Sequence, residues 1–294
     1  MTAAIATLGQ FGLDSSNPVT KRLDYMSENL VMREVPIDAN GLRGTRSPNV
    51  DRVRMGLRYI GGTINLQPNP VETGLLLEWI MGASPSGSGP VTYALADTLP
   101  SRYITVDRVA KVFTYAGCKV DKATFRCNQG QALEISLDVV GTTETVGNSG
   151  TFPSLSIDTS AGPWIFSDMA ISLNSSTLTV RECEIVVDNV IDRERFFNSN
   201  TLTTVETLDR NVFFRTMVPY GDWTSLYGAS GAGGLDCVAT FTNGVYILTM
   251  TFGKVVIPRT TPMSPGRREI MLPLEGKAYK TGSTRELSIA LATS

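Results

Sequence analysis

The sequence contains one β-rich run twice. Residues 105–141 align without a gap on residues 240–276, an offset of 135 positions, as from Thr105 to Thr240. Eight aligned positions are identical, where chance would give about two over such a window. The identical pairs are Thr105 and Thr240, Thr114 and Thr249, Lys119 and Lys254, Val120 and Val255, Glu134 and Glu269, Ile135 and Ile270, Leu137 and Leu272, and Gly141 and Gly276. The chain is therefore expected to build the same strand-rich unit twice.

Two weaker matches keep the same order upstream. Residues 82–84 match residues 228–230, and residues 32–34 resemble residues 180–182. Together the three matches predict a tandem duplication of a domain of about 145 residues. We expect a first domain over residues 1–150, opening with an N-terminal arm over residues 1–27, and a second domain over residues 151–294.

Alternating apolar and polar residues predict strands along most of the chain. A helix is expected over residues 71–81, because Pro70 and Glu72 suit its first turn, and a short one near Trp223. Strands are expected near 30–37, 53–66, 103–106, 110–115, 119–125, 132–140, 165–173, 178–187, 205–218, 236–241, 245–252, 255, 269–276 and 285–291. The predicted fold class is mainly β with short helices: two tandem β-sandwich domains, each with one flanking helix.

The composition excludes several kinds of chemistry. The net charge is −2 and histidine is absent, which removes the Ser/His/Asp triad, the Cys/His dyad and imidazole metal ligands. The four cysteines, Cys118, Cys127, Cys183 and Cys237, lack metal-ligand spacing and are expected to be free thiols. We predict no cofactor, no metal and no enzymatic activity, while a pair of carboxylates leaves glycosidase-type chemistry as an alternative.

Membrane insertion is not expected. Residues 1–10 lack the basic start and sustained apolar core of a secretory signal. The longest apolar run, residues 75–81, is too short to cross a bilayer and contains Glu78. These features predict a soluble protein that is made in a cytoplasm.

One strand in each copy has a polar face. Glu134, Ser136 and Asp138 alternate with apolar residues, and Glu269 and Glu275 fall on one face of the second copy. Two interpretations remain open from the residues alone. The face is either an ordinary solvated sheet surface or the lining of a channel.

A charged, glycine-containing excursion follows the first predicted strand, over residues 38–49, and its partner in the second half spans residues 188–195. A loop of this length in a compact β domain is usually functional or mobile. The excursions contain Asn40, Arg43 and Arg46 in the first copy and Asp192, Arg193 and Arg195 in the second.

The sequence resembles a known family at this point. The segments that carry the likeness are residues 113–120, from Phe113 to Val120, residues 134–141, from Glu134 to Gly141, and residues 186–189 in the second half. In pattern and order they are similar to the major tail tube proteins of long-tailed bacteriophages, in the version with an internally repeated tube domain.

The resemblance implies a structural virion protein whose sheets join edge to edge into rings, and whose stacked rings form the conduit for genome ejection. Two domains per chain imply three copies per ring with pseudo-sixfold symmetry, with hexameric rings as the alternative. The implied bore-facing residues are Glu134, Ser136, Asp138, Glu269 and Glu275. The implied inter-ring residues are Asn40, Arg43, Arg46, Asp192, Arg193 and Arg195.

The resemblance also implies partners and a location. The partners would be further copies of the chain, the tape-measure protein, the tail terminator and distal tail proteins. Double-stranded DNA would pass through a neutral or weakly acidic bore without specific binding, because exposed Lys or Arg would hold its phosphates. The location would be the virion tail, after assembly in the host cytoplasm. The competing interpretation is a carbohydrate-binding β-sandwich module of a phage tail, such as a receptor-binding or fibre module.

Overall fold

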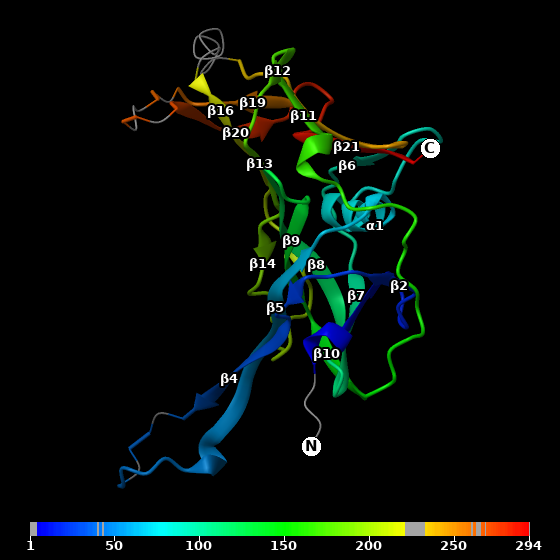
Figure 1. Ribbon diagram of the computed structural model, residues 1–294. Coiled ribbons are helices and arrows are strands. Elements are labelled where there is room, and N and C mark those ends of the chain that lie inside the picture. Colours follow the sequence, from blue (N-terminus) through cyan, green and yellow to red (C-terminus); the bar gives the residue numbers. More distant parts are fainter. Residues whose placement is uncertain are drawn as a thin grey trace.

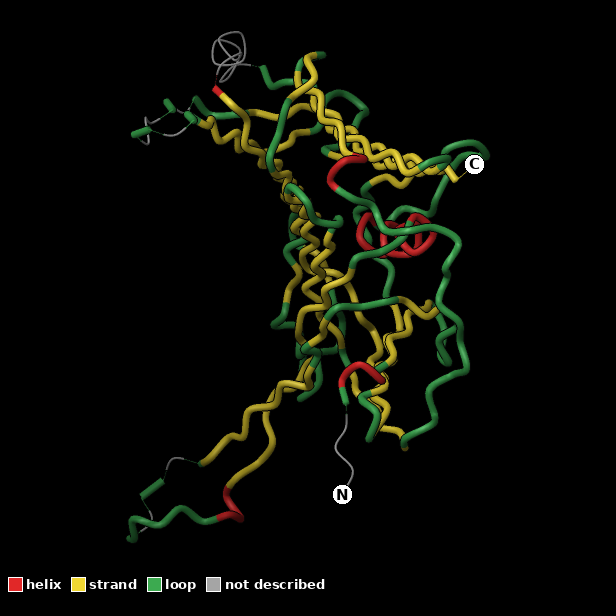
Figure 2. The backbone as a smooth tube through the Cα atoms, in the orientation of Figure 1, coloured by secondary structure: helices red, strands yellow, loops and turns green. Residues whose placement is uncertain are grey.

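The computed structural model describes residues 5–39, 41–42, 44–220, 233–259, 261–262, 266–267 and 269–293. Strands dominate this part of the chain, and α1 (Pro70–Met81) is the one α-helix within it (Figure 1, Figure 2). The predicted mainly β fold class is confirmed. The second predicted helix, near Trp223, lies outside the described residues.

The other elements are short 3-10 helices and strands. The 3-10 helices are η1 (Ala6–Leu8), η2 (Val50–Arg52) and η3 (Phe166–Asp168). The strands of the first half are β1 (Gln10–Asp14), β2 (Lys21–Leu23), β3 (Ser27–Glu28), β4 (Val31–Asp38), β5 (Val53–Leu66), β6 (Val91–Ala94), β7 (Arg102–Asp107), β8 (Lys111–Asn128), β9 (Glu134–Gly141) and β10 (Thr143–Asn148). Those of the second half are β11 (Met169–Leu173), β12 (Ser176–Leu178), β13 (Glu182–Asp188), β14 (Ile191–Asp192), β15 (Glu206–Thr207), β16 (Asn211–Pro219), β17 (Cys237–Asn243), β18 (Tyr246–Phe252), β19 (Lys254–Val256), β20 (Met271–Tyr279) and β21 (Leu287–Thr293).

One continuous layer of strands runs through both halves of the chain. Its order is β19–β20–β16–β13–β8–β9–β5–β4, and we call it the long sheet. The halves meet where β13 pairs antiparallel with β8, from Glu182 opposite Asn128 to Asp188 opposite Lys122. Each half therefore contributes four neighbouring strands to one sheet.

Two further layers pack against the long sheet and give each half a sandwich-like form. In the first half, β8 also pairs with β10 and β7, and β7 leads to β1 and β2. In the second half, a six-stranded sheet has the order β12–β11–β17–β18–β21–β6, in which β6 comes from the first half. The helix α1 lies against β6, β21 and β8 (Figure 1). The buried core between these layers includes Trp79, Trp164 and Phe214.

β8 turns from one layer into the other at Gly117. Its early residues pair with β7 and β10, and its later residues pair with β9 and β13. Gly117 has a φ of +66°, and a Cβ there would lie 2.5 Å from Oγ1 of Thr142. We predicted separate strands over residues 110–115 and 119–125. The structure has one strand instead, because glycine lets the backbone bend between layers without ending the strand.

The helix α1 begins in a capping box. The side chain of Asn69 accepts a hydrogen bond from the Glu72 backbone N–H at 2.9 Å, and the Glu72 carboxylate accepts one from the Asn69 N–H at 3.1 Å. Both bonds satisfy backbone donors that an uncapped first turn would leave free. The helix stops at Gly82, which has a φ of +93°. It begins one residue before the predicted range of 71–81.

The strand pairings of the two halves follow the same order. Thr105 lies opposite Thr114 in the β7–β8 pair, and Thr240 lies opposite Thr249 in the β17–β18 pair. Further along, Lys119 faces Val140, whereas Lys254 faces Tyr279 rather than Glu275. The last strand of the second half has therefore slid by four positions, an even number that leaves each side chain on its own face. The origin of this order by duplication stays a prediction.

Part of the predicted N-terminal arm belongs to the sandwich. Within residues 1–27, β1 pairs with both β2 and β7. Phe11, Leu13 and Leu23 are buried in the core. Residues 10–14 and 21–23 are thus strands of the first half.

Candidate functional site

The polar face predicted on β9 is present in the structure. Ile135, Leu137 and Val139 are buried in the core. Glu134, Ser136 and Asp138 alternate with them and are half-buried on the opposite face. The alternation follows from the pleat of a strand, which sends successive side chains to opposite sides.

A row of alternating charges crosses this face. Residues directly opposite one another in neighbouring antiparallel strands share a face, so the register places the whole row on one side of the long sheet. The row consists of Glu134 on β9, Arg126 on β8, Glu184 on β13, Arg215 on β16 and Glu275 on β20. We call these five residues the charged row. The charged row contains two of the predicted residues, Glu134 in the first half and Glu275 in the second, and it crosses the β8–β13 pairing between the halves.

The arginines of the charged row are held by its carboxylates. Arg215 lies between Glu184 and Glu275, with nitrogen–oxygen distances of 2.9 and 2.8 Å. Arg126 lies 3.9 Å from Glu184. The hydrogen bonds that Arg215 donates to Glu184 and to Glu275 raise the pKa of its guanidinium above the ordinary value. The positive charge of Arg215 is therefore paired within the sheet.

Other polar pairs on the same face surround Asp138. Its carboxylate accepts a hydrogen bond from the Thr63 hydroxyl at 2.6 Å. Lys122 lies opposite both Asp138 and Asp188 in the register. The register thus places an aspartate on each of the two strands beside Lys122.

Glu269, the remaining predicted bore residue, lies just before β20. It forms an ion pair with Arg181 near the start of β13. Both side chains are about half exposed. The bore-facing position of Glu269 and of the charged row stays a prediction.

Sequence reasoning missed Arg126, Glu184 and Arg215. Alternation along β8 and β13 places such residues on a polar face. It gives no information on which strands are neighbours or on their register. The pairing of β8 with β13 joins residues far apart in the sequence and emerges only from the fold.

The second charged excursion is folded onto the first half. We call residues 189–210, which contain β14 and β15, the second arm. Arg193 forms an ion pair with Asp121 of β8, and Arg195 lies 3.7 Å from Asp192. Val140 of β9 is buried in a small apolar cluster with Ile191, Leu202 and Val205 of this arm.

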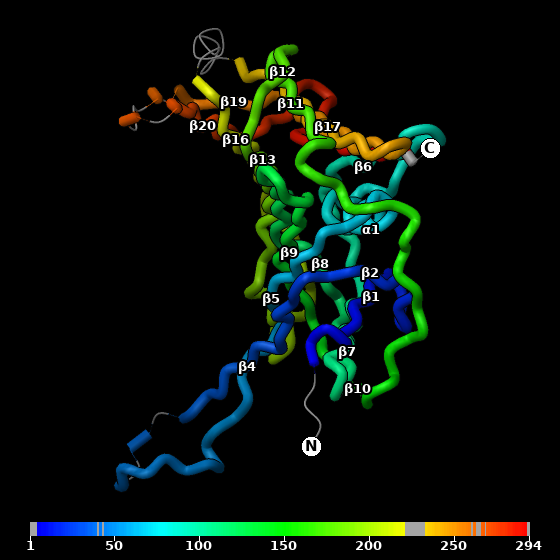
Figure 3. The backbone as a smooth tube through the Cα atoms, in the orientation of Figure 1, coloured from blue at the N-terminus to red at the C-terminus, as the bar shows by residue number. Residues whose placement is uncertain are grey.

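The first excursion, in contrast, projects from the molecule. We call the outer part of the β4–β5 hairpin and its connecting loop, residues 34–57, the first arm. It extends away from the body in Figure 1 and Figure 3. Arg46 is exposed near its tip, while Asn40 and Arg43 lie outside the described residues. Inter-ring contacts by these residues stay a prediction.

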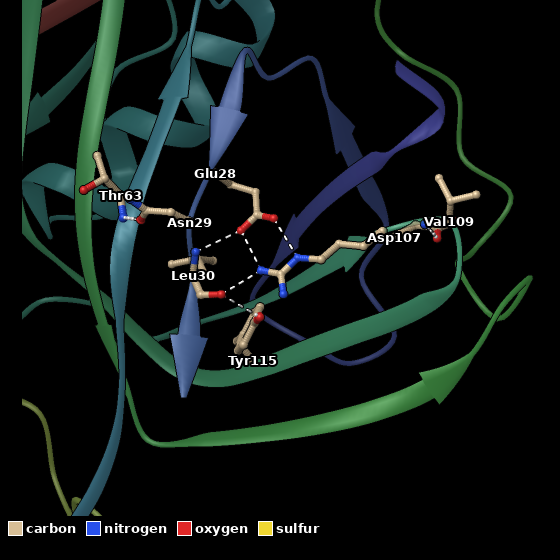
Figure 4. A network of polar contacts seen from close by, with 8 residues as sticks. Glu28, Asn29, Leu30, Thr63, Asp107, Val109 and Tyr115 are labelled. Atoms are coloured by element: carbon tan, nitrogen blue, oxygen red, sulfur yellow. Dashed lines mark hydrogen bonds and ion pairs between the residues drawn. The ribbon is translucent and has the colours of Figure 1, made fainter. Parts of the chain in front are cut away.

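A polar network fixes the chain where β3 passes into β4 (Figure 4). Arg108 binds Glu28 through two nitrogen–oxygen contacts of 2.8 Å. The carbonyl oxygen of Leu30 accepts hydrogen bonds from Arg108 at 2.6 Å and from the Tyr115 hydroxyl at 3.0 Å. Figure 4 shows Glu28, Leu30 and Tyr115 converging on this point. The network therefore holds the β3–β4 edge of the long sheet against β7 and β8 of the first-half layer.

Replacing Arg108 with methionine is expected to lower the free energy of unfolding by about 2 kcal/mol, since the Glu28 carboxylate would stay poorly hydrated without its partner. The Glu28 side chain is 8% exposed. Urea unfolding followed by fluorescence measures the change. Lys111→Met, at an exposed cation three residues further along at the start of β8, is the matched control and should change stability by less than about 0.5 kcal/mol. Equal effects of the two substitutions would contradict a stabilising role for the network.

The described part of the chain contains no group of three or more Asp, Glu or Cys side chains placed to hold a metal ion. The four cysteines are free and buried. Burial raises the pKa of Cys127 to about 11 and raises that of Cys118 as well, so these thiols are protonated and unreactive near neutral pH.

Among the described residues, no helix has both the length and the apolar character needed to cross a bilayer.

The fold and this face define a β-rich structural protein with a long shared sheet and a polar, charge-paired surface. The family model for the phage tail tube protein matches residues 7–278. The chain therefore belongs to the phage tail tube protein family, which confirms the predicted resemblance. No curated protein matches the sequence. Family membership makes the chain a structural component of a bacteriophage tail.

Proposed function

We propose that copies of this chain join through the ends of the long sheet into rings, and that stacked rings form the conduit through which the genome leaves the virion. Three copies form one ring with pseudo-sixfold symmetry, because each chain supplies two similar groups of four strands. The tape-measure protein, the tail terminator and distal tail proteins are the proposed partners. Assembly takes place in the host cytoplasm.

The continuity of the long sheet carries this proposal. β13 and β8 already join two four-strand groups side by side within the chain. In the described residues, β4 pairs only with β5, and residues 271–276 of β20 pair only with β16. Unpaired edges of this kind are templates for pairing with another chain, and closure into a barrel removes them. Further copies supply the missing neighbours.

The strand number is consistent with a channel for DNA. Three copies with four strands in each half give about twenty-four strands. Barrels of sixteen to eighteen strands already enclose an aqueous pore. A bore lined by the charged row would present carboxylates and arginines that are already paired, so the DNA phosphates meet few free cations. Glu134, Ser136, Asp138, Glu269 and Glu275 are the proposed bore residues.

Electron microscopy of the purified protein at rising concentration tests the proposal. We expect rings with threefold symmetry and, at higher concentration, tubules of stacked rings. Labelling of the tail shaft in virions with an antibody against the chain is the second measurement. A discrete small oligomer together with labelling of fibres at the tail tip would contradict the tube and favour the carbohydrate-binding interpretation.

A further inference from the structure

The two arms are equivalent parts of two equivalent hairpins. The β13–β16 hairpin continues into the second arm, where Ile191 of β14 lies opposite Thr207 of β15. The β4–β5 hairpin continues into the first arm, where pairing extends to Asp38 opposite Val53. The second arm packs on the neighbouring half of the same chain, whereas the first arm projects into solvent (Figure 1).

The contacts of the second arm define a receiving surface on the first half. Arg58 of β5 donates its backbone N–H to the Asn200 carbonyl at 2.7 Å, and its own carbonyl accepts from Leu202 at 3.2 Å. Lys119 of β8 donates from Nζ to the Val205 carbonyl at 2.6 Å. Val140, which faces Lys119 in the register, is fully buried beneath the arm.

The second half has an equivalent pair of positions on β19 and β20. Lys254 there binds Asp236 at 2.9 Å, and Lys277 lies 5.7 Å from the centre of the Tyr279 ring. Lys254 occupies the position of Lys119 in the repeated run, and it faces Tyr279 as Lys119 faces Val140. Tyr279 is 47% exposed, while Val140 is fully buried. An exposed tyrosine therefore stands where the first half has a residue covered by an arm.

The first arm has the apolar surface that such a site needs. Val35, Ile37, Met55 and Leu57 are each between 49% and 67% exposed. They lie on a two-stranded hairpin, which is only marginally stable in water without something to pack on. Exposed apolar residues in this number on one projection are typical of an interaction site.

We propose that the first arm of one copy docks on the β19–β20 surface of the second half of the next copy in the same ring. It covers Tyr279 there as the second arm covers Val140. The second copy of this chain is the occupant because the same kind of arm already sits on the equivalent surface within the chain. The arm is thus a lateral clasp between neighbours. This inference extends the proposed function by naming the surfaces that join subunits.

Two single variants and their mixture test the clasp. Ile37→Asp damages the arm and leaves the receiving surface intact, while Tyr279→Asp does the reverse. Each variant alone is expected to stay a monomer of 31.8 kDa under conditions in which the unmodified chain assembles. An equimolar mixture has one intact arm and one intact surface per pair. It should therefore form a dimer of about twice that mass and stop there. Light scattering coupled to size-exclusion chromatography measures both.

The controls separate the clasp from misfolding and from the tube itself. Both residues are exposed, so the variants should keep the thermal midpoint of the unmodified chain. Val245→Asp, at an equally exposed apolar residue in the β17–β18 turn, should assemble normally. Three results would overturn the clasp. The first is that a single variant forms closed rings that fail to stack, which would place the arm between rings. The others are tubules formed by either single variant and a mixture that stays monomeric. Dimers from the mixture would support the clasp whatever the outcome of the electron microscopy and antibody labelling, which test the proposed function separately.

Discussion

Replacing Glu184 and Glu275 together with glutamine is expected to raise the affinity of the protein for double-stranded DNA by about tenfold or more at low salt. In the unmodified protein Arg215 is bound by both carboxylates, at 2.9 and 2.8 Å. Neutral glutamines keep the shape of the side chains but remove the charges that hold the guanidinium. Arg215 and the neighbouring Arg126 then become available to phosphates, and released counterions favour binding.

The measurement is fluorescence anisotropy of a labelled duplex at increasing salt. The affinity of the double variant should fall steeply with salt, which is typical of phosphate contacts. Glu144→Gln combined with Asp209→Asn is the matched control, because it removes the same charge away from the charged row. Arg215 is about half exposed, so only a small change in folding stability is expected. Equal DNA affinities of the two double variants would refute the shielding role of the charged row.

Replacing Trp79 with alanine is expected to lower the free energy of unfolding by about 3–5 kcal/mol, the usual cost of removing a large buried aromatic side chain. Trp79 is fully buried in α1, and its indole N–H donates to the Cys118 carbonyl at 3.1 Å. Cys118 follows Gly117, where β8 turns between layers. The substitution therefore removes packing and a hydrogen bond at the point where helix and both layers meet.

Urea unfolding followed by circular dichroism measures this change. Val71→Ala, on the partly exposed side of the same helix, is the control for helix formation itself and should cost less than about 1 kcal/mol. Trp79→Phe keeps most of the apolar volume and should give an intermediate loss. A loss below about 1 kcal/mol for Trp79→Ala would show that α1 is not a structural anchor of the sandwich.

Local elements were predictable where the chemistry of a few residues decides them. The long strand over residues 53–66 has the predicted bounds, and the strands predicted over residues 236–241 and 245–252 form the β17–β18 hairpin, whose turn is Gly244 and Val245. The sequence predicts two strands, over residues 110–115 and 119–125, where the structure has the single strand β8 with a bend at Gly117. Its role as a corner depends on the two sheets it joins, which a local pattern does not contain.

The sequence could predict which side chains of the candidate site share a face of the sheet. It could not predict which residues on neighbouring strands they contact. Alternation placed Glu134 and Asp138 opposite the core, since the pleat alone decides this. The arginines that neutralise Glu184 and Glu275 depend on the register across strands from both halves. The course of the second arm was also beyond the sequence, because Ile191, Leu202 and Val205 find their apolar partner on a strand of the other half.

The strand β6 has a consequence for how a tail bears load. It comes from the first half, yet it pairs with β21 in the outer layer of the second, from Leu291 opposite Val91 to Ser288 opposite Ala94. The two halves of each chain are therefore joined by strand pairing in both layers, β8 with β13 and β6 with β21, and by the continuous polypeptide. In the proposed tube, bending or tension is therefore expected to separate neighbouring chains before it separates the two halves of one chain.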